Sequence, residues 1–128
     1  MKSVVICGST RFKSEIRKFS QKLKALGVVV YEPFLHSGDL EWEKLSINYK
    51  KFTALGLTHD HFYKIQMADV VFIYNQNGYA GNSTTLEIGF SVAMGKPIYA
   101  LAEDDELCRQ VLFREIITSP KELVKQLA

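Results

Sequence analysis

Continuous apolar runs alternate with amphipathic segments along this chain of 128 residues. Four of the runs have the length of a β-strand: Val4–Cys7, Val28–Tyr31, Val70–Tyr74 and Ile98–Leu101. Continuous rather than alternating hydrophobicity is typical of strands that are buried on both faces of a parallel sheet. Phe113–Thr118 supplies a fifth predicted strand.

Helical periodicity fills most of the remaining chain. The first amphipathic helix is predicted to end at Gly27, a residue that readily adopts positive φ. Two helices are predicted before the third strand, one ending near Gly56 and the next beginning at Thr58. Another should follow the third strand as far as about Met94. A last helix should begin at Ser119–Pro120, with Ser as N-cap and Pro at the first helical position.

This order of elements predicts a single α/β domain over residues 1–128. We expect three layers around a doubly wound, five-stranded parallel sheet of flavodoxin-like or Rossmann-like form, with strand order 2-1-3-4-5. In that order the first and third strands flank the switch point, where open α/β folds bind their ligands. The loops Gly8–Arg11 and Asn75–Ser83 should therefore lie side by side.

The first of these loops, Gly8-Ser9-Thr10-Arg11, opens a helix. Its backbone N–H groups, hydroxyls and helix dipole suit an anion, and Arg11 could hold a phosphate with two parallel hydrogen bonds. The alternative is that Ser9 or Thr10 only caps the helix and Arg11 is a solvated charge. Neither a Walker loop nor a Gly-x-Gly-x-x-Gly dinucleotide motif is present.

The second loop combines glycines with amide side chains. Gly78 and Gly81 allow a close approach to a ligand, while Asn75 and Asn82 offer donors and acceptors for sugar hydroxyls or base edges. Tyr79 could stack on a base. The alternative is a Gly/Asn-rich turn that binds nothing.

Glu87 follows this loop at the start of the predicted helix. A carboxylate there could attack an electrophilic sugar carbon. It also fits a capping box, Thr84-Thr85-Leu86-Glu87, in which the Glu bonds back to the N-cap residue. The two roles are compatible, because a cap would hold the carboxylate in place.

Four other residues have ordinary structural explanations beside functional ones. Asp60 is either a surface charge or a site carboxylate near the switch point. His59 and His61 face different ways on a helix, so we expect no metal site. Cys7, at a strand end beside a helix N-terminus, is predicted to be a buried structural thiol rather than a reactive one.

The near balance of positive and negative charges indicates which classes of molecule the protein is expected to bind. Lys and Arg number 16 and Asp and Glu 14, so the net charge is +2. This gives no electrostatic footprint for a nucleic acid polymer, although a single phosphate needs only a local site. No apolar run approaches the roughly 20 residues of a membrane helix. The two cysteines, Cys7 and Cys108, suggest reduced thiols, and we expect a cytoplasmic protein without membrane association.

Four ordered motifs resemble the nucleoside 2-deoxyribosyltransferase-like family, which includes 2′-deoxynucleoside 5′-monophosphate N-glycosidases. The motifs are CGSTR from Cys7, ADVV from Ala68, GYAGNSTTLEIGF from Gly78 and GKPI from Gly95. The resemblance covers residues 3–101. It implies a flavodoxin-like fold and a glutamate, here Glu87, that attacks C1′ of the deoxyribose to form a covalent glycosyl ester.

The same resemblance implies further roles. Gly8, Ser9 and Arg11 match the 5′-phosphate site of the nucleotide-hydrolysing branch, and Ser83 lies close to its phosphate-binding hydroxyl. Asp60 is the nearest candidate for an assisting aspartate, although the most direct register places His61 there.

The chain also departs from the family pattern. Val5 and Ile6 stand where members often carry a tyrosine. In the transferases an acidic residue often lies shortly before the glutamate, and here Gly81 and Asn82 occupy that stretch.

We therefore expect an N-glycosidase or deoxyribosyltransferase that acts on a (deoxy)nucleoside or its 5′-monophosphate, without metal or organic cofactor. Asn75, Gly78, Tyr79 and Asn82 should line its pocket, and the resemblance implies a homodimer or larger homo-oligomer. The alternatives are a nucleotide-binding or sensing module without turnover, and an oligomerising scaffold that binds no nucleotide.

Overall fold

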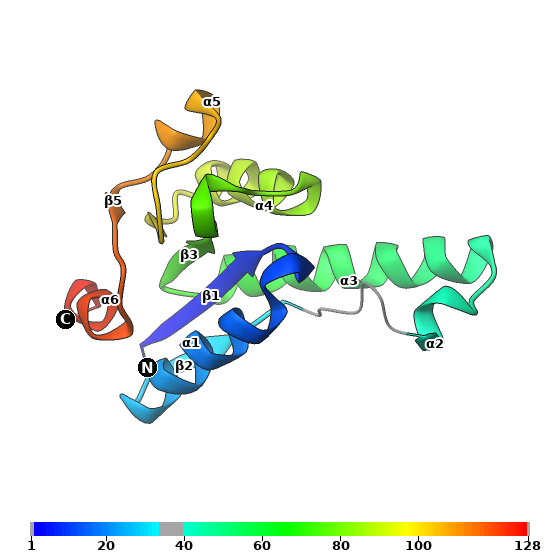
Figure 1. The fold of residues 1–128 in the computed structure, drawn as a ribbon, viewed down its shortest axis with the longest axis horizontal. Helices are drawn as coiled ribbons and strands as arrows, with labels where there is room; N and C mark the ends of the chain where they lie inside the picture. The colour runs from blue at the N-terminus through cyan, green and yellow to red at the C-terminus, as the bar shows by residue number, and fades with distance from the viewer. Residues whose placement is uncertain (1, 34–39, 128) are drawn as a thin grey trace.

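A five-stranded parallel sheet forms the centre of the molecule (Figure 1). The computed structural model describes residues 2–33 and 40–127. The strands are β1 (Ser3–Gly8), β2 (Val29–Tyr31), β3 (Val70–Tyr74), β4 (Ile98–Ala100) and β5 (Glu115–Ile116). Their order is β2-β1-β3-β4-β5 and every adjacent pair is parallel, which confirms the predicted fold class and strand order.

The two central strands carry the register that positions the site. All five residues of β3 are buried, as its apolar run predicts for a strand covered on both faces. Cys7 of β1 pairs with Ile73 of β3, and Gly8 pairs with Tyr74. The two strands thus end together, and the loops that follow them leave the same edge of the sheet, as predicted.

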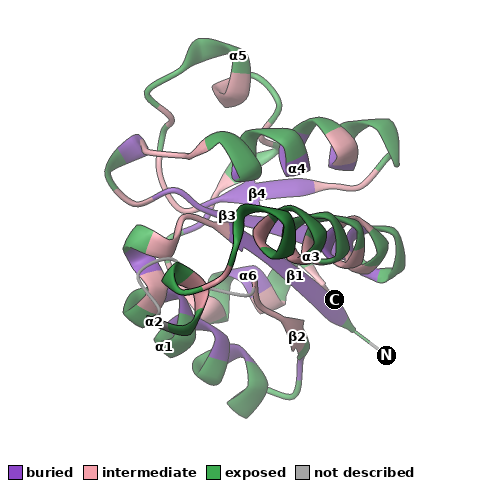
Figure 2. Ribbon diagram, turned by 90° about the vertical axis from the view of Figure 1, so that its right-hand side faces the viewer, coloured by how far each residue is buried: buried purple, intermediate pink, exposed green. Residues whose placement is uncertain are grey.

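Helices cover both faces of this sheet. On one face α1 (Lys13–Ala25) packs beside α6 (Pro120–Gln126), and on the other α3 (Ile47–Met67) packs beside α4 (Asn82–Ala93). The strands β1, β3 and β4 form the buried layer, whereas the helices are exposed on their outer turns (Figure 2).

The alternation of side chains along β1 assigns Cys7 to one of these two faces. Val4 and Ile6 join the core beneath α1, whereas Val5 and Cys7 join the core beneath α3 and α4. Cys7 therefore points at the helices that carry the histidine and glutamate described below.

The prediction of two helices before β3 is wrong in one respect. A single helix, α3, runs through Gly56 and Thr58 without a break. An interior glycine costs a helix only about 1 kcal/mol relative to alanine, and the packing of a 21-residue helix outweighs that cost. Ser46 caps this helix, and Trp42 lies in a separate short helix, α2 (Leu40–Glu43).

The predicted helix ends are largely confirmed. Gly27 ends the first helix with φ of 87°, and Ser119 caps α6 by accepting a hydrogen bond from the Glu122 backbone N–H. The shorter elements are η1 (Thr10–Phe12), η2 (Gln76–Gly78) and α5 (Leu107–Gln110). Within the described residues, no helix is both long enough and apolar enough for a membrane crossing.

Candidate active site

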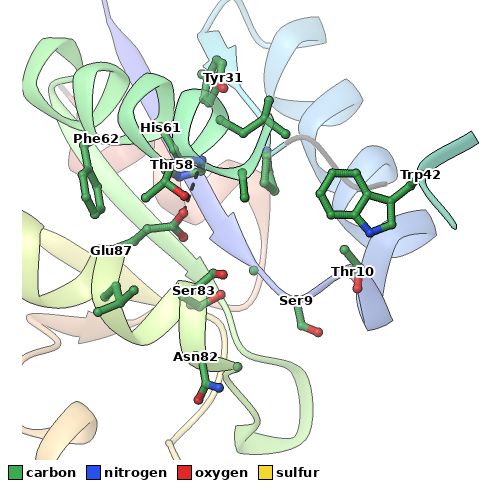
Figure 3. Close-up of a pocket in the computed structure, with 17 residues that line it drawn as sticks. Ser9, Thr10, Tyr31, Trp42, Thr58, His61, Phe62, Asn82, Ser83 and Glu87 are labelled. Carbon is green, nitrogen blue, oxygen red and sulfur yellow. Dashed lines mark ion pairs between the residues drawn. The ribbon is translucent and has the colours of Figure 1, made fainter. Parts of the chain in front are cut away.

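A pocket of about 400 Å³ opens at the carboxyl edge of the sheet, beside the loop that follows β1 and the start of α4 (Figure 3). The middle of α3 forms another wall. The described residues that line it are Gly8, Ser9, Thr10, Tyr31, Pro33, Trp42, Ala54, Leu57, Thr58, His61, Phe62, Gly81, Asn82, Ser83, Thr84, Leu86 and Glu87.

Glu87 lies in the second turn of α4 rather than at its cap. The helix begins at Asn82 with Gly81 as N-cap, three residues before the Thr84 that a capping box requires. The capping-box interpretation is therefore wrong: Thr84 is already inside the helix. Glu87 is only 9% exposed, and its carboxyl group faces α3 across the pocket wall.

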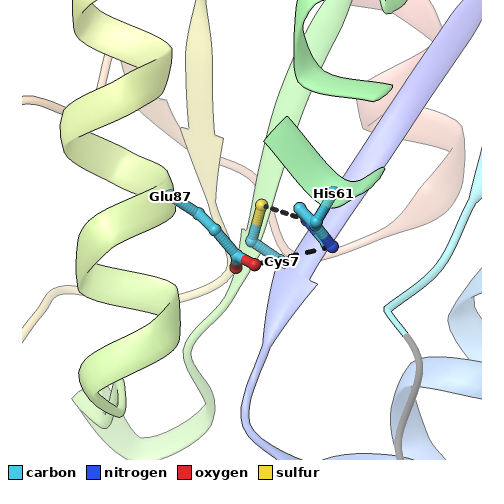
Figure 4. A group of neighbouring side chains, drawn as sticks. All are labelled: Cys7, His61 and Glu87. Carbon is cyan, nitrogen blue, oxygen red and sulfur yellow. Dashed lines mark hydrogen bonds and ion pairs between the residues drawn. The ribbon is translucent and has the colours of Figure 1, made fainter. Parts of the chain in front are cut away.

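His61 meets this carboxyl group from α3. Its Nδ1 lies 3.5 Å from Glu87 Oε2, while its Nε2 lies 3.2 Å from Cys7 Sγ (Figure 4). Both His61 and Cys7 are buried. One imidazole ring thus connects a thiol on β1 with a carboxyl group on α4.

Burial governs the charge of this trio. It raises the pKa of Glu87 to about 8, against the opposing effect of a hydrogen bond from Cys7. Burial lowers the pKa of His61 to about 4, against the opposing charge of Asp60. Burial also raises the pKa of Cys7 well above its ordinary value, and Glu87 adds to that effect. Near neutral pH all three groups therefore favour their uncharged forms.

Asp60 is not among the described residues that line the pocket. Its Oδ2 accepts a 2.6 Å hydrogen bond from the Tyr31 hydroxyl, and its Oδ1 lies 3.9 Å from Lys64 Nζ. Burial and this hydrogen bond both raise the pKa of Tyr31. Tyr31 lines the pocket and its ring meets that of His61 edge-on at 5.4 Å, so Asp60 touches the site only through another side chain.

The loop after β1 has two roles, since it lines the pocket and also caps the helix that follows. Gly8, Ser9 and Thr10 line the pocket, while Ser9 Oγ also accepts a 3.2 Å hydrogen bond from the Arg11 backbone N–H. The guanidinium of Arg11 stacks over the Tyr79 ring, 3.7 Å from its centroid, instead of lining the pocket. Its predicted contact with phosphate is therefore not in place in this structure.

Gly8 is required by close packing rather than by backbone conformation. A Cβ atom there would lie 2.7 Å from a methyl carbon of Ile16 and 3.2 Å from the carbonyl oxygen of Tyr74. A larger residue would therefore require the Ile16 side chain or the loop to shift.

Three residues of the second loop are not where the pocket prediction places them. Asn75 is fully buried and exchanges two hydrogen bonds with the backbone of Ala102, at 2.9 and 3.0 Å. Gly78, with φ of 80°, packs against Asp105. Tyr79 packs on Phe12 and Arg11, described above.

These three residues lie outside the pocket because their loop runs toward the segment after β4. The Asp105 backbone N–H donates a hydrogen bond to the Gly78 carbonyl oxygen and so joins the two segments. Asn82 and Ser83, by contrast, line the pocket as predicted.

Sequence reasoning passed over two members of the central trio. The register of the family resemblance points to His61, but the resemblance implies a carboxylate, for which Asp60 is the nearest candidate. The position of Cys7 at a strand end predicts a structural thiol, although the alternation of strand side chains indicates which helices it faces.

The trio also offers the ligand types that zinc prefers. One atom each from Cys7, His61 and Glu87 can be chosen so that all three lie within 4.8 Å of one another. The two ring nitrogens of His61, however, face different partners. Without a metal ion the trio forms a chain of polar contacts, and an ion held by all three residues would replace the contact that the second ring nitrogen makes.

Comparison with known proteins agrees with the fold. The sequence model of the family described as nucleoside 2-deoxyribosyltransferase matches residues 6–120. No curated protein matches the chain.

Solved structures share the fold at low identity. A 2-deoxyribosyltransferase from Bacillus psychrosaccharolyticus has a TM-score of 0.70 at 20% identity, over 94% of this chain and 89% of its own. A CMP N-glycosidase from Clostridium botulinum has a TM-score of 0.54 at 21% identity, over 98% of both chains. A conserved protein from Enterococcus faecalis has a TM-score of 0.57 at 16% identity, over 99% of this chain and 97% of its own.

The family match spans most of the chain, including β1, α3 and α4, which carry the trio. The chain therefore belongs to the nucleoside 2-deoxyribosyltransferase family.

Proposed function

We propose that this protein cleaves the N-glycosidic bond of a (deoxy)nucleoside or its 5′-monophosphate, with Glu87 as the nucleophile. Family membership supports this class of reaction. One observation carries the choice of residue: the Glu87 carboxyl group lines the pocket and lies 3.5 Å from an imidazole nitrogen. A buried carboxyl beside a base is a common arrangement for an activated nucleophile.

The proposed reaction has two displacement steps. A carboxylate oxygen of Glu87 forms a bond to C1′ as the bond from C1′ to the base nitrogen breaks, through an oxocarbenium-like transition state. The product is a glycosyl ester on Glu87. Water or a second base then attacks C1′ and releases the carboxylate, which gives hydrolysis or transfer respectively.

The other walls of the pocket suit the remaining parts of such a substrate. Ser9, Thr10 and Ser83 supply hydroxyl groups that fit a sugar or a 5′-phosphate, and Ser83 lies in the first turn of α4, where the helix dipole favours an anion. Trp42 and Phe62 supply aromatic surface for a base. The volume of about 400 Å³ falls within the usual range for small-molecule sites.

A panel of nucleosides and 5′-monophosphates, analysed by chromatography for free base, tests the proposal. We expect base release by the wild type and essentially none by Glu87→Gln. Glu122→Gln is the matched control, because Glu122 is an exposed acid on α6, away from the pocket. A 2-fluoro sugar analogue should leave a covalent adduct on the peptide that contains Glu87, detectable by mass spectrometry.

A nucleotide-binding or sensing module is the second candidate, and one observation favours it. Burial raises the pKa of Glu87 to about 8, so the carboxyl is mostly protonated at neutral pH, and a protonated carboxyl is a poor nucleophile. Tight nucleotide binding without base release, unchanged in Glu87→Gln, would support this candidate and exclude the enzyme.

A further inference from the structure

The two ring nitrogens of His61 face two different groups, the thiol of Cys7 and the carboxyl group of Glu87. We propose that His61 accepts the carboxyl proton of Glu87 to create the nucleophile and later returns it, while Cys7 is a positioning residue that fixes the ring. This inference rests on the proposed N-glycosidic reaction. It adds to that reaction a route by which a buried, protonated acid becomes reactive.

The geometry assigns one nitrogen to each task. Nε2 lies 3.2 Å from Cys7 Sγ, and Nδ1 lies 3.5 Å from Glu87 Oε2. With the hydrogen on Nε2, the ring donates to the sulfur and leaves the Nδ1 lone pair facing the carboxyl O–H. Cys7 is 0% exposed and lies on a central strand, so the atom that holds the ring is itself rigidly placed.

The surroundings of His61 allow a brief positive charge. From β2, the Tyr31 ring packs edge-on against the imidazole at 5.4 Å. Asp60, which accepts a hydrogen bond from the Tyr31 hydroxyl, carries a negative charge that raises the pKa of His61. Lys64 lies 3.9 Å from the other oxygen of Asp60. Burial opposes a lasting imidazolium, so the ring should release its proton readily once the reaction is complete.

The proton balance closes over one hydrolytic turnover. The carboxyl proton of Glu87 moves to Nδ1 of His61, and the freed carboxylate forms the ester at C1′. The electron pair of the broken C1′–N bond stays on the base, which takes a proton from water. The resulting hydroxide forms the new C1′–O bond and expels the Glu87 carboxylate, and His61 then returns its proton.

The pH dependence of kcat in His61→Gln tests the assignment, with a substrate identified from the panel above. We expect kcat to fall on the order of 10²- to 10⁴-fold with little change in KM. The residual rate should rise with pH toward the pKa of Glu87, about 8, because solvent must then remove the proton. Cys7→Ala should also lower kcat, by less than His61→Gln does, and Cys7→Ser should retain more activity than Cys7→Ala.

A second measurement does not depend on turnover. The ¹⁵N spectrum of the histidine rings, with His61 assigned by its loss in His61→Gln, should show the hydrogen on Nε2 in the resting protein. In Cys7→Ala that preference should weaken. If His61→Gln is too unstable for kinetics, this spectrum still tests the proposal. The signals of the His61 ring are then assigned by selective labelling.

The two proposals fail in different ways. A His61→Gln variant with wild-type kcat and pH profile, beside an inactive Glu87→Gln, would overturn the proton relay and leave the N-glycosidase intact. Full activity in Glu87→Gln would instead overturn the proposed function. A hydrogen on Nδ1 in the resting protein would also contradict the relay, because that nitrogen could not then accept a proton.

Discussion

His61 Nδ1 lies 3.5 Å from Glu87 Oε2, and this contact joins α3 to α4 at the wall of the pocket. The neighbouring residue Phe62 stacks on Phe90 of α4, with ring centroids 4.5 Å apart and an angle of 16° between the rings. Packing between two helices, rather than a loop, therefore sets the distance between base and acid. A site built in this way tolerates little change at the helix interface.

The stability of the fold should depend on pH through both members of this contact. Between its ordinary value of 4.5 and about 8, the folded protein holds a proton on Glu87 that the unfolded chain releases, so stability falls as pH rises. Between about 4 and 6.5, His61 has the opposite effect, because only the unfolded chain is protonated there. The two effects oppose each other below 6.5, and only that of Glu87 remains from 6.5 to 8.

We therefore expect the free energy of unfolding to fall by up to about 2 kcal/mol between pH 6.5 and 8. Urea denaturation at a series of pH values measures it. Glu87→Gln should flatten this region, because an amide does not titrate. An equal slope in wild type and variant would show that Glu87 is not the group responsible.

Asp60 should influence the reaction only indirectly, through its hydrogen bond with Tyr31 and its charge near His61, because it is not among the described residues that line the pocket. We expect Tyr31→Phe to cost about 1 kcal/mol of stability, the net value of one hydrogen bond, and Asp60→Asn to cost less, because an amide oxygen still accepts from the Tyr31 hydroxyl. The double variant should cost less than the sum of the two, since Tyr31→Phe removes and Asp60→Asn weakens the same contact. Thermal or urea unfolding of the four proteins in this cycle measures the coupling.

The same cycle, followed by kcat, separates an indirect role of Asp60 from a direct one. Asp60→Asn should reduce kcat much less than Glu87→Gln does. If Asp60→Asn lowered kcat as much as Glu87→Gln does, Asp60 would act directly as an acid or base.

The sheet could be predicted from the sequence because its strands are continuous apolar runs, and burial on both faces leaves few other arrangements for them. The sequence could not predict whether Asp60 or His61 contacts Glu87. Successive residues on a helix point about 100° apart. The rotation of α3 about its axis therefore decides which side chain reaches Glu87, and that rotation depends on packing against the sheet and α4.

The position of Glu87 within its helix could not be predicted from the sequence either, for a related reason. Thr84 and Glu87 match the capping box as letters, yet the helix already begins at Asn82 because the extended backbone of Gly81 provides the N-cap. Local pattern alone cannot exclude a helix start one turn earlier.

The predicted homo-oligomer and the predicted cytoplasmic location stay predictions.

A chelator should leave base release unchanged, because the proposed chemistry uses no metal ion. Added Zn²⁺ should inhibit it, since one atom each from Cys7, His61 and Glu87 can be chosen within 4.8 Å of one another and a bound ion would occupy the nucleophile. Activity assays with a chelator, with Zn²⁺, and with Zn²⁺ followed by chelator measure both effects. Loss of activity on chelation would show that a metal takes part in the reaction.

Two asparagines of the same loop region should separate structural from binding roles. Asn75 is fully buried and its amide bonds both the carbonyl and the N–H of Ala102, whereas Asn82 is exposed at the pocket wall. Asn75→Ala should lower the free energy of unfolding by about 1–3 kcal/mol, because it leaves buried backbone groups without partners. Asn82→Ala should leave stability within about 0.5 kcal/mol of wild type.

Substrate affinity should show the reverse order. Asn82→Ala should raise KM, and Asn75→Ala, assayed at a temperature where it stays folded, should not. The two substitutions remove the same amide group, so chemistry alone cannot produce a difference between them. A raised KM in folded Asn75→Ala, with no effect in Asn82→Ala, would mean that substrate binding turns the Asn75 loop toward the pocket. The original prediction that Asn75 contacts the ligand would then hold for the bound state.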